Sequence, residues 1–378
     1  MCRRWLCGDH LQGRRGGILA RVKKHIYIYS PSSAVRDKVA FRRGVKRLKA
    51  LGHEVELDVD ALSSHQRFAG DDATRVQAIT RAAASGADVA LISRGGYGLT
   101  RLLPTLPYAD IAKAIEGGMH WVGLSDFTAL QMGLMAHQQR ARGGQGAAAR
   151  TVPATADTFG LGAITWAGPA LGEDFGADPK LGDEANPLPD DIMEACFDDL
   201  LCGLGEGTGW RLPKPDVAAL EGLSKTEAEI PINTSDTGVF DIKNAVLWGG
   251  NLTVLTSLVG TPWLPTVPGG VLFVEDVGEH PYRVERLLTT LLHAGVLAQQ
   301  RAVVLGQFSR YKLVPGHDRG YKLTTVVDWL RAQLAPRGVP VLTGLPFGHV
   351  ATKVLLPVGR VVDLAVHGRE ALMFWDGH

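Results

Sequence analysis

The chain has 378 residues, a length typical of two to three domains at about 150 residues each. Hydrophobic residues make up 45% and charged residues 21%, the balance of a globular protein that buries sizeable cores without disulfides or structural metal. Lys and Arg number 40 against 39 Asp and Glu, so the net charge gives no reason to expect binding to nucleic acid or to an acidic membrane surface. The sequence has no run of about 18 apolar residues, so no transmembrane helix is predicted.

The N-terminal residues 1–24 are basic and Gly-rich, without an apolar run long enough for a signal sequence. We expect them to form a disordered extension and the protein to be cytoplasmic. The cysteines Cys2, Cys7, Cys196 and Cys202 form neither a C-x-x-C motif nor a dense, regular pattern. A reducing compartment fits this pattern.

Strands and helices alternate through the first part of the chain. The expected strands are 25–30, 54–59, 88–94 and 120–124, and the expected helices are 35–51, 74–85, 108–116 and 126–138. This alternation predicts βαβ units and a doubly wound parallel sheet. Ligands bind such sheets at the carboxyl ends of the strands. The loops SPSS (30–33) and RGGYG (94–98) and the turn at Ser125 leave those ends.

A second ordered block, richer in strands, begins near residue 237. Its expected strands are 245–248, 271–276, 302–308, 339–344, 353–358, 360–366 and 371–375, interrupted by helices 281–294 and 324–334. We therefore predict an N-terminal α/β domain (25–171) and a β-rich C-terminal α/β domain (240–378). Residues 172–239, with one expected helix at 190–201, are predicted to be a linker region. The Gly/Ala-rich stretch 140–156 resembles an inserted loop.

Ser125 lies between a buried strand and a helix, a turn that exposes its hydroxyl at a helix N-terminus. Free backbone N–H groups and the helix dipole there favour a developing oxyanion. The sequence G-L-S-D-F departs from the G-x-S-x-G elbow because Phe127 replaces the second glycine. A serine before such a helix, followed by Asp126 in the first turn, is more often an N-cap.

Gly95, Gly96 and Gly98 follow a buried strand, so their backbone amides face the same sheet edge as Ser125. Their spacing matches neither the dinucleotide fingerprint G-x-G-x-x-G nor a P-loop. A tight turn that requires positive φ explains these glycines equally well.

Two further residues complete a set of chemically useful groups. Glu275 ends the apolar run VLFV, and His349 lies in the restricted loop GLPFGH. Asp276 and Glu279 near Glu275 would suit a cation, but no His or Cys at ligand spacing accompanies them, so no metal site is predicted. Ser, Glu and His together supply a nucleophile, an orienting carboxylate and a base.

A series of segments along the chain resembles the LD-carboxypeptidase family of serine peptidases, in particular its muramoyltetrapeptide carboxypeptidases. The segments are YSPSSAV, RFAGDDATRVQAI, SRGGYGLTRLLP, GLSDFTALQMGLMAH, WAGPALGEDFGAD, WGGNLTVLTSLVGTPWLP, VEDVGEHPYRVERLLTTLLHAG and GLPFGHVATKVLLPVG. The resemblance implies that Ser125 is the nucleophile, Glu275 the acid and His349 the base. The N–H groups of Asp126 and of the Gly95–Gly96 turn would hold the oxyanion.

The same resemblance implies a flavodoxin- or Rossmann-like N-terminal domain, a β-rich C-terminal domain, a homodimer, and no metal or other cofactor. The implied reaction removes D-alanine from the L-centre of the third residue of murein tetrapeptides in peptidoglycan recycling, with the residue of the diaminopimelate type. Two alternatives stay open. One is a microcin-immunity hydrolase of the same family, and the other is a non-catalytic nucleotide- or sugar-binding α/β protein. The last would leave the GLPFGH and VED segments without a role.

Overall fold

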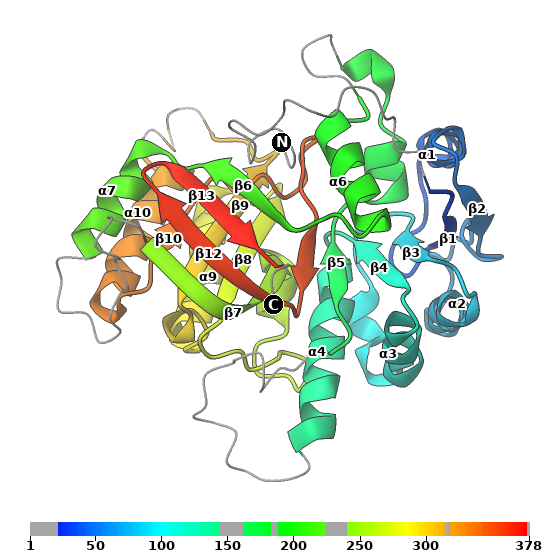
Figure 1. Ribbon diagram of the computed structural model, residues 1–378, viewed down its shortest axis with the longest axis horizontal. Coiled ribbons are helices and arrows are strands. Elements are labelled where there is room, and N and C mark those ends of the chain that lie inside the picture. The colour runs from blue at the N-terminus through cyan, green and yellow to red at the C-terminus, as the bar shows by residue number, and fades with distance from the viewer. Residues whose placement is uncertain are drawn as a thin grey trace, which may run out of the picture.

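The computed structural model of the chain describes residues 22–143, 162–182, 188–223, 240–314, 316, 318 and 320–375. Two sheets with their helices lie beside one another, the first built mainly from the N-terminal part of the chain (Figure 1). The expected extension 1–24 and the expected inserted loop 140–156 lie largely outside the described residues. Within the described ranges, no helix combines the length and the apolar character needed to cross a membrane.

The first sheet has six strands in the order β11-β5-β4-β3-β1-β2. They are β1 (His25–Tyr29), β2 (Glu54–Leu57), β3 (Val89–Ile92), β4 (His120–Gly123), β5 (Thr165–Ala167) and β11 (Leu356–Val358). The strands β1 to β5 pair in parallel, and β11 pairs antiparallel with β5. The order 2-1-3-4-5 is that of flavodoxin, with its switch point between β1 and β3. The predicted flavodoxin-like fold class is thus confirmed.

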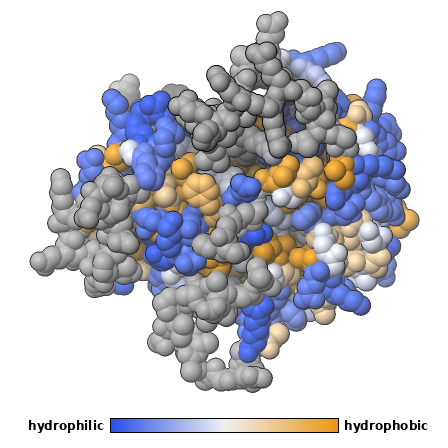
Figure 2. Space-filling view, in the orientation of Figure 1, coloured by the Kyte–Doolittle hydropathy of each residue, from blue (hydrophilic) through white to orange (hydrophobic). Residues whose placement is uncertain are grey.

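Helices on both faces of this sheet bury its central strands. They include α1 (Lys38–Ala50), α2 (Asp72–Ala84), α3 (Tyr108–Glu116) and α4 (Phe127–Gly143). All four residues of β3 are buried, which explains why its sequence is continuously apolar rather than alternating. The outer edge over α1 and β2 carries mainly hydrophilic side chains on the face shown in Figure 2.

The second sheet has seven strands in the order β10-β9-β8-β7-β12-β13-β6. They are β6 (Gly207–Arg211), β7 (Phe240–Asn251), β8 (Val271–Val277), β9 (Ala302–Ser309), β10 (Val341–Leu342), β12 (Val361–His367) and β13 (Glu370–Phe374). Strands β7 to β10 are parallel and the other three are antiparallel. Helices α8 (Leu252–Ser257), α9 (Pro281–His293) and α10 (Leu323–Leu334) accompany the parallel half. This is the strand-rich α/β arrangement that the sequence predicts.

Residues 172–239 contain regular elements in their described part, and these contact both sheets. They are α6 (Asp191–Leu201), β6 and α7 (Lys214–Leu223), preceded by the short helices η3 (Leu171–Phe175) and η4 (Pro179–Leu181). Helix α6 is held to α1 by two bonds from Arg47 to Glu194, of 2.6 and 2.8 Å, whereas β6 is the edge strand next to β13. The domain boundaries of the sequence analysis stay a prediction.

A buried ion pair joins the segment before β11 to the segment after β5. Lys353 Nζ lies 2.6 Å from Asp174 Oδ1, and the two residues are 2% and 6% exposed. The second oxygen of Asp174 accepts a 2.7 Å bond from the N–H of Ala170. Because both charges are withdrawn from water, each depends on the other for compensation.

We predict that Lys353→Met lowers the free energy of unfolding by about 3–5 kcal/mol, because it leaves the Asp174 carboxylate buried without its cation. Urea unfolding followed by circular dichroism measures this change. Lys23→Met, which removes the exposed pair with Glu54, is the control and should hardly move the midpoint. The double variant Lys353→Met/Asp174→Leu should recover stability, and equal midpoints for Lys353→Met and wild type would contradict the prediction.

Candidate active site

Ser125 adopts an unusual backbone conformation in the turn between β4 and α4. Its φ is 64°, in the left-handed region that residues other than glycine rarely occupy. An N-cap residue has an extended backbone, so this serine does not have the geometry of a helix cap. The strand–turn–helix arrangement and the strained φ are those of a nucleophile elbow. Ser125 is partly exposed, while Asp126 and Phe127 after it are buried.

The glycine-rich loop after β3 approaches Ser125 closely. A Cβ atom on Gly95 would lie 2.7 Å from Ser125 Cβ and 3.0 Å from its Oγ, so no larger residue fits there. The next residue, Gly96, has a φ of 112°. Within the described part of the chain, the backbone N–H groups of Gly95, Gly96 and Asp126 have no acceptor. The loop therefore places unengaged donors beside the serine hydroxyl.

The Asp126 side chain has a separate set of contacts. Its Oδ2 atom accepts bonds from Ser32 Oγ at 2.7 Å and from Leu99 N at 2.8 Å. Burial raises the pKa of Asp126, and these bonds and the charge of Arg75 offset part of that rise. The sequence assigned a role only to the Asp126 N–H group, and this buried carboxylate was missed.

Glu275 and His349 form a buried hydrogen-bonded pair. His349 Nδ1 lies 2.7 Å from Glu275 Oε2, and the residues are 7% and 0% exposed. The pairing register of β8 with β9 shifts between Val274 and Asp276, the kind of irregularity that re-aims a side chain. With Glu275 ionised, Nδ1–H donates to the carboxylate and leaves Nε2 as the basic nitrogen. Burial lowers the pKa of His349, but the Glu275 hydrogen bond and charge outweigh it, so the pKa is raised.

The loop carrying His349 can reach Glu275 only because Gly348 precedes it. Gly348 has a φ of 139°, and a Cβ there would lie 2.8 Å from the carbonyl oxygen of Gln307 and 3.2 Å from Glu275 Oε2. The carbonyl of His349 accepts a 3.0 Å bond from Ser309 Oγ at the end of β9. Backbone geometry and this bond hold the imidazole in place.

Thr128 and Asn251 connect the Glu275–His349 pair to the helix of Ser125. Asn251 Nδ2 donates to Glu275 Oε1 at 3.2 Å, and the Asn251 N–H donates to Thr128 Oγ1 at 3.0 Å. Thr128 is in the first turn of α4, three residues after Ser125. The described chain contains no direct hydrogen bond between Ser125 Oγ and His349. Catalytic hydrogen bonds often tighten only when substrate is bound.

Sequence reasoning missed this connection, although the W-G-G-N motif at the end of β7 carried a signal for it. Gly250 has a φ of 138°, and a Cβ there would lie 2.4 Å from Thr128 Oγ1. A pair of glycines before a polar residue at a strand end is typical of such a close approach.

No group of three or more His, Cys, Asp or Glu residues within the described ranges could hold a metal ion. Asp276, which lies in the acidic cluster for which the sequence predicts no metal site, is engaged by protein donors. Its carboxylate accepts bonds from Thr253 N and Oγ1 and from Asn251 Nδ2, of 2.9, 2.7 and 3.0 Å. Burial raises the pKa of Asp276.

Comparison with known proteins identifies similar chains over most of the length. Residues 26–147 match the model of the LD-carboxypeptidase N-terminal domain, and residues 244–364 match that of the C-terminal domain. A Synechocystis sp. protein with a provisional carboxypeptidase name is 30% identical over 342 residues, 89% of this chain and 90% of its own. The microcin C7 self-immunity protein MccF of Escherichia coli is 28% identical over 72% of this chain and 69% of its own.

A solved structure shares both sequence and fold with this chain. The crystal structure of muramoyltetrapeptide carboxypeptidase from Oxalobacter formigenes is 35% identical, with a TM-score of 0.69. The match covers 92% of this chain and 97% of that one. The chain therefore belongs to the LD-carboxypeptidase family.

Proposed function

We propose that this protein is a cytoplasmic, homodimeric serine LD-carboxypeptidase of peptidoglycan recycling. Its substrate is a murein tetrapeptide, free or as part of a muropeptide, whose third residue is of the diaminopimelate type. The enzyme hydrolyses the bond between the L-centre of that residue and the terminal D-alanine. Ser125 is the nucleophile, His349 the base and Glu275 the acid that orients it.

One observation carries this proposal: hydrogen bonds run without a break from His349 through Glu275 and Asn251 to Thr128. These bonds attach a buried acid–base pair to the first turn of the helix that follows Ser125. A nucleophile, a base and an orienting carboxylate are thus linked within one site, as in other serine hydrolases.

The chemistry that these residues support is acyl transfer. Nε2 of His349 removes the Ser125 proton, and the alkoxide attacks the carbonyl of the third residue. The N–H groups of Gly95, Gly96 and Asp126 stabilise the tetrahedral oxyanion, and one such donor lowers the barrier by about 3–4 kcal/mol. His349 then protonates the leaving D-alanine, and water resolves the acyl-enzyme by the same route.

The named relatives support two related substrates. The Oxalobacter formigenes relative is named for muramoyltetrapeptide, and MccF is named for immunity to microcin C7. The higher identity to the first favours the murein peptide. Incubation with a muropeptide panel and with an aminoacyl sulfamoyl adenosine, followed by mass spectrometry, distinguishes them. Release of the amino acid from the nucleoside alone would transfer the assignment to the microcin-immunity branch.

We predict that Ser125→Ala abolishes release of D-alanine while the protein stays folded. The substitution removes only the hydroxyl. The remaining groups can still bind substrate and stabilise the oxyanion, so we expect only a small residual acceleration over the uncatalysed hydrolysis. Product mass measures turnover, and circular dichroism confirms the fold. Ser257→Ala, which removes an exposed hydroxyl on α8, is the control and should retain full turnover. Substantial activity in Ser125→Ala would show that another group is the nucleophile.

The raised pKa of His349 predicts the pH dependence of kcat/KM. The base must be neutral, so activity should fall as the pH drops through the pKa of His349, which lies above the ordinary value for a histidine. Glu275→Gln removes the charge that raises this pKa, and the imidazole should then titrate at a lower pH. A pH–rate profile of the wild type and an NMR titration of the His349 ring in the variant measure the two effects. An unchanged titration in Glu275→Gln would contradict the assigned pair.

We predict that the enzyme releases D-alanine from a tetrapeptide but leaves a D-Ala-D-Ala terminus intact. Because the nucleophile and the oxyanion site are fixed in position, the nucleophile can attack only one face of the carbonyl group. Inverting the adjacent α-carbon swaps the side chain with the hydrogen and moves the carbonyl out of line. A misplacement of about 1 Å costs about 100-fold in rate. Comparison of tetrapeptide, pentapeptide and an L-alanine-terminated tetrapeptide by product mass measures this. Efficient cleavage of the pentapeptide would instead identify a DD-carboxypeptidase.

A further inference from the structure

Two loops at the switch point of the first sheet are each held by a carboxylate and by a guanidinium. The loops are residues 30–33, after β1, and residues 94–99, after β3 and leading into the short helix η1 (Leu99–Arg101). Asp126 Oδ2 accepts from Ser32 Oγ in the first loop at 2.7 Å and from Leu99 N in the second at 2.8 Å. One oxygen atom beside the nucleophile therefore ties both loops to the turn of Ser125.

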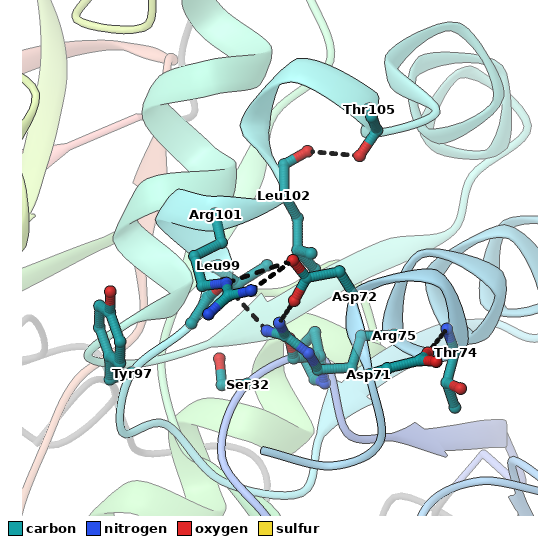
Figure 3. A network of polar contacts seen from close by, with 12 residues as sticks. Ser32, Asp71, Asp72, Thr74, Arg75, Tyr97, Leu99, Arg101, Leu102 and Thr105 are labelled. Atoms are coloured by element: carbon teal, nitrogen blue, oxygen red, sulfur yellow. Dashed lines mark hydrogen bonds and ion pairs between the residues drawn. The ribbon is translucent and has the colours of Figure 1, made fainter. Parts of the chain in front are cut away.

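Arg75 of α2 holds the neighbouring residues of the same loops. Its Nη1 donates to the carbonyl of Pro31 at 3.3 Å and to that of Gly98 at 2.9 Å. The guanidinium is fully buried and lies 4.6 Å from the centre of the Phe68 ring. Nη2 pairs with Asp72 at 2.5 Å. Figure 3 shows the Arg75 side chain reaching the Asp72 carboxylate, to which Arg101 also points.

We call Asp126 and Arg75 together the loop clamp, because each of them binds both loops through groups of opposite hydrogen-bonding type. The carboxylate binds the donors of Ser32 and Leu99, and the guanidinium binds the carbonyls of the residues directly before them. The position of Arg75 is tightly fitted, because a Cβ on Gly98 would lie 2.5 Å from its Nη1. Burial raises the pKa of Asp126, and the charge of Arg75 offsets part of that rise.

The glycine pair beside the nucleophile lies inside the clamped loop. Gly98 and Leu99 are fixed at its far end, and Tyr97 is fixed by its N–H bond of 3.1 Å to Ser33 Oγ. Gly95 and Gly96 lie just before these anchored residues, and Gly96 has a φ of 112°. Glycine has a wider choice of backbone conformations than other residues, so the anchors are needed to select one of them. An oxyanion site needs donors held before the reaction begins, since reorganisation would add to the barrier.

We propose that the Asp126 carboxylate and the Arg75 guanidinium are positioning residues that hold the Gly95–Gly96 N–H groups at the distance from Ser125 that the reaction requires. This inference rests on the proposed function, in which Ser125 is the nucleophile. The carboxylate does not touch the substrate, and its effect on catalysis passes through the loop. It therefore acts on kcat more than on KM, because the oxyanion forms only in the transition state.

The test compares kcat and KM for three substitutions at the carboxylate end of the clamp. Asp126→Ala removes both bonds and should lower kcat by about 100-fold, as expected for a misplacement of about 1 Å. Asp126→Asn keeps an oxygen that accepts from both donors and should stay within about tenfold of wild type. Ser32→Ala removes one bond without changing charge and should fall between wild type and Asp126→Ala. KM should change little in all three.

Ser30→Ala is the matched control for Ser32→Ala. Ser30 is equally buried in the same segment, but its hydroxyl bonds to the Ala61 carbonyl at 2.7 Å and to Ser93 Oγ at 2.6 Å. It makes no hydrogen bond with Asp126, so its loss should lower thermal stability without lowering kcat. Equal kcat values for Ser30→Ala and Ser32→Ala would overturn the proposal, as would a full kcat in Asp126→Ala.

A second measurement makes the proposal independent of the substrate. Ser125 attacks the phosphorus of a small fluorophosphonate and fluoride leaves, with the phosphoryl oxygen in the oxyanion site. The rate of this labelling should fall in the order wild type, Asp126→Asn, Asp126→Ala. Ser125→Ala is run in parallel: if it still hydrolyses tetrapeptide, the proposed function fails. If Ser125→Ala is inactive and unlabelled while Asp126→Ala is labelled at the wild-type rate, only the loop clamp is refuted.

Discussion

The burial of Glu275 is the constraint on which the proposed active site depends. A carboxylate without exposure to solvent is stable only if donors replace the water that it lost. Those donors are His349 Nδ1–H on one oxygen and Asn251 Nδ2 on the other. Because the backbone N–H of Asn251 also donates to Thr128, the donors that satisfy one buried carboxylate link His349, the proposed base, to the helix that follows Ser125, the proposed nucleophile. The bonds that stabilise the buried carboxylate therefore also set the geometry of the proposed active site.

The site also depends on two glycines that let loops from different sheets approach Glu275 and Ser125 closely. Gly348 lets the loop of His349 pass within contact of Glu275, and Gly95 lets a second loop pass within contact of Ser125. A side chain at either position would push the loop away by more than a hydrogen bond tolerates. The loops at the carboxyl ends of parallel strands gather at one edge of a sheet, which explains why these glycines, far apart in sequence, lie so close to Ser125 and Glu275.

Local features of the chain were predictable, and contacts between distant segments were not. The helix at 108–116 was predicted to the residue, because its apolar spacing and end signals are local. Strand β5 was missed because three residues are too few to show an alternating pattern of apolar side chains. The pairing of β11 with β5 joins segments that lie far apart in the sequence, so no local pattern predicts it. Ser125 was singled out by its strand–helix turn. Its left-handed φ, which separates it from an N-cap, depends on packing that a sequence does not display.

The loop that carries His349, the proposed base, is held by segments of both sheets. At one end, the His349 carbonyl binds Ser309 of the second sheet. Four residues later, Lys353 is paired with Asp174, which follows a strand of the first sheet. Lys353 also lowers the pKa of His349, whereas the exposed Glu173 beside Asp174 raises it. Residues 349–353 are thus bonded at one end to the second sheet and at the other to a residue that follows β5 of the first. The position of the His349 imidazole therefore depends on the relative position of the two sheets.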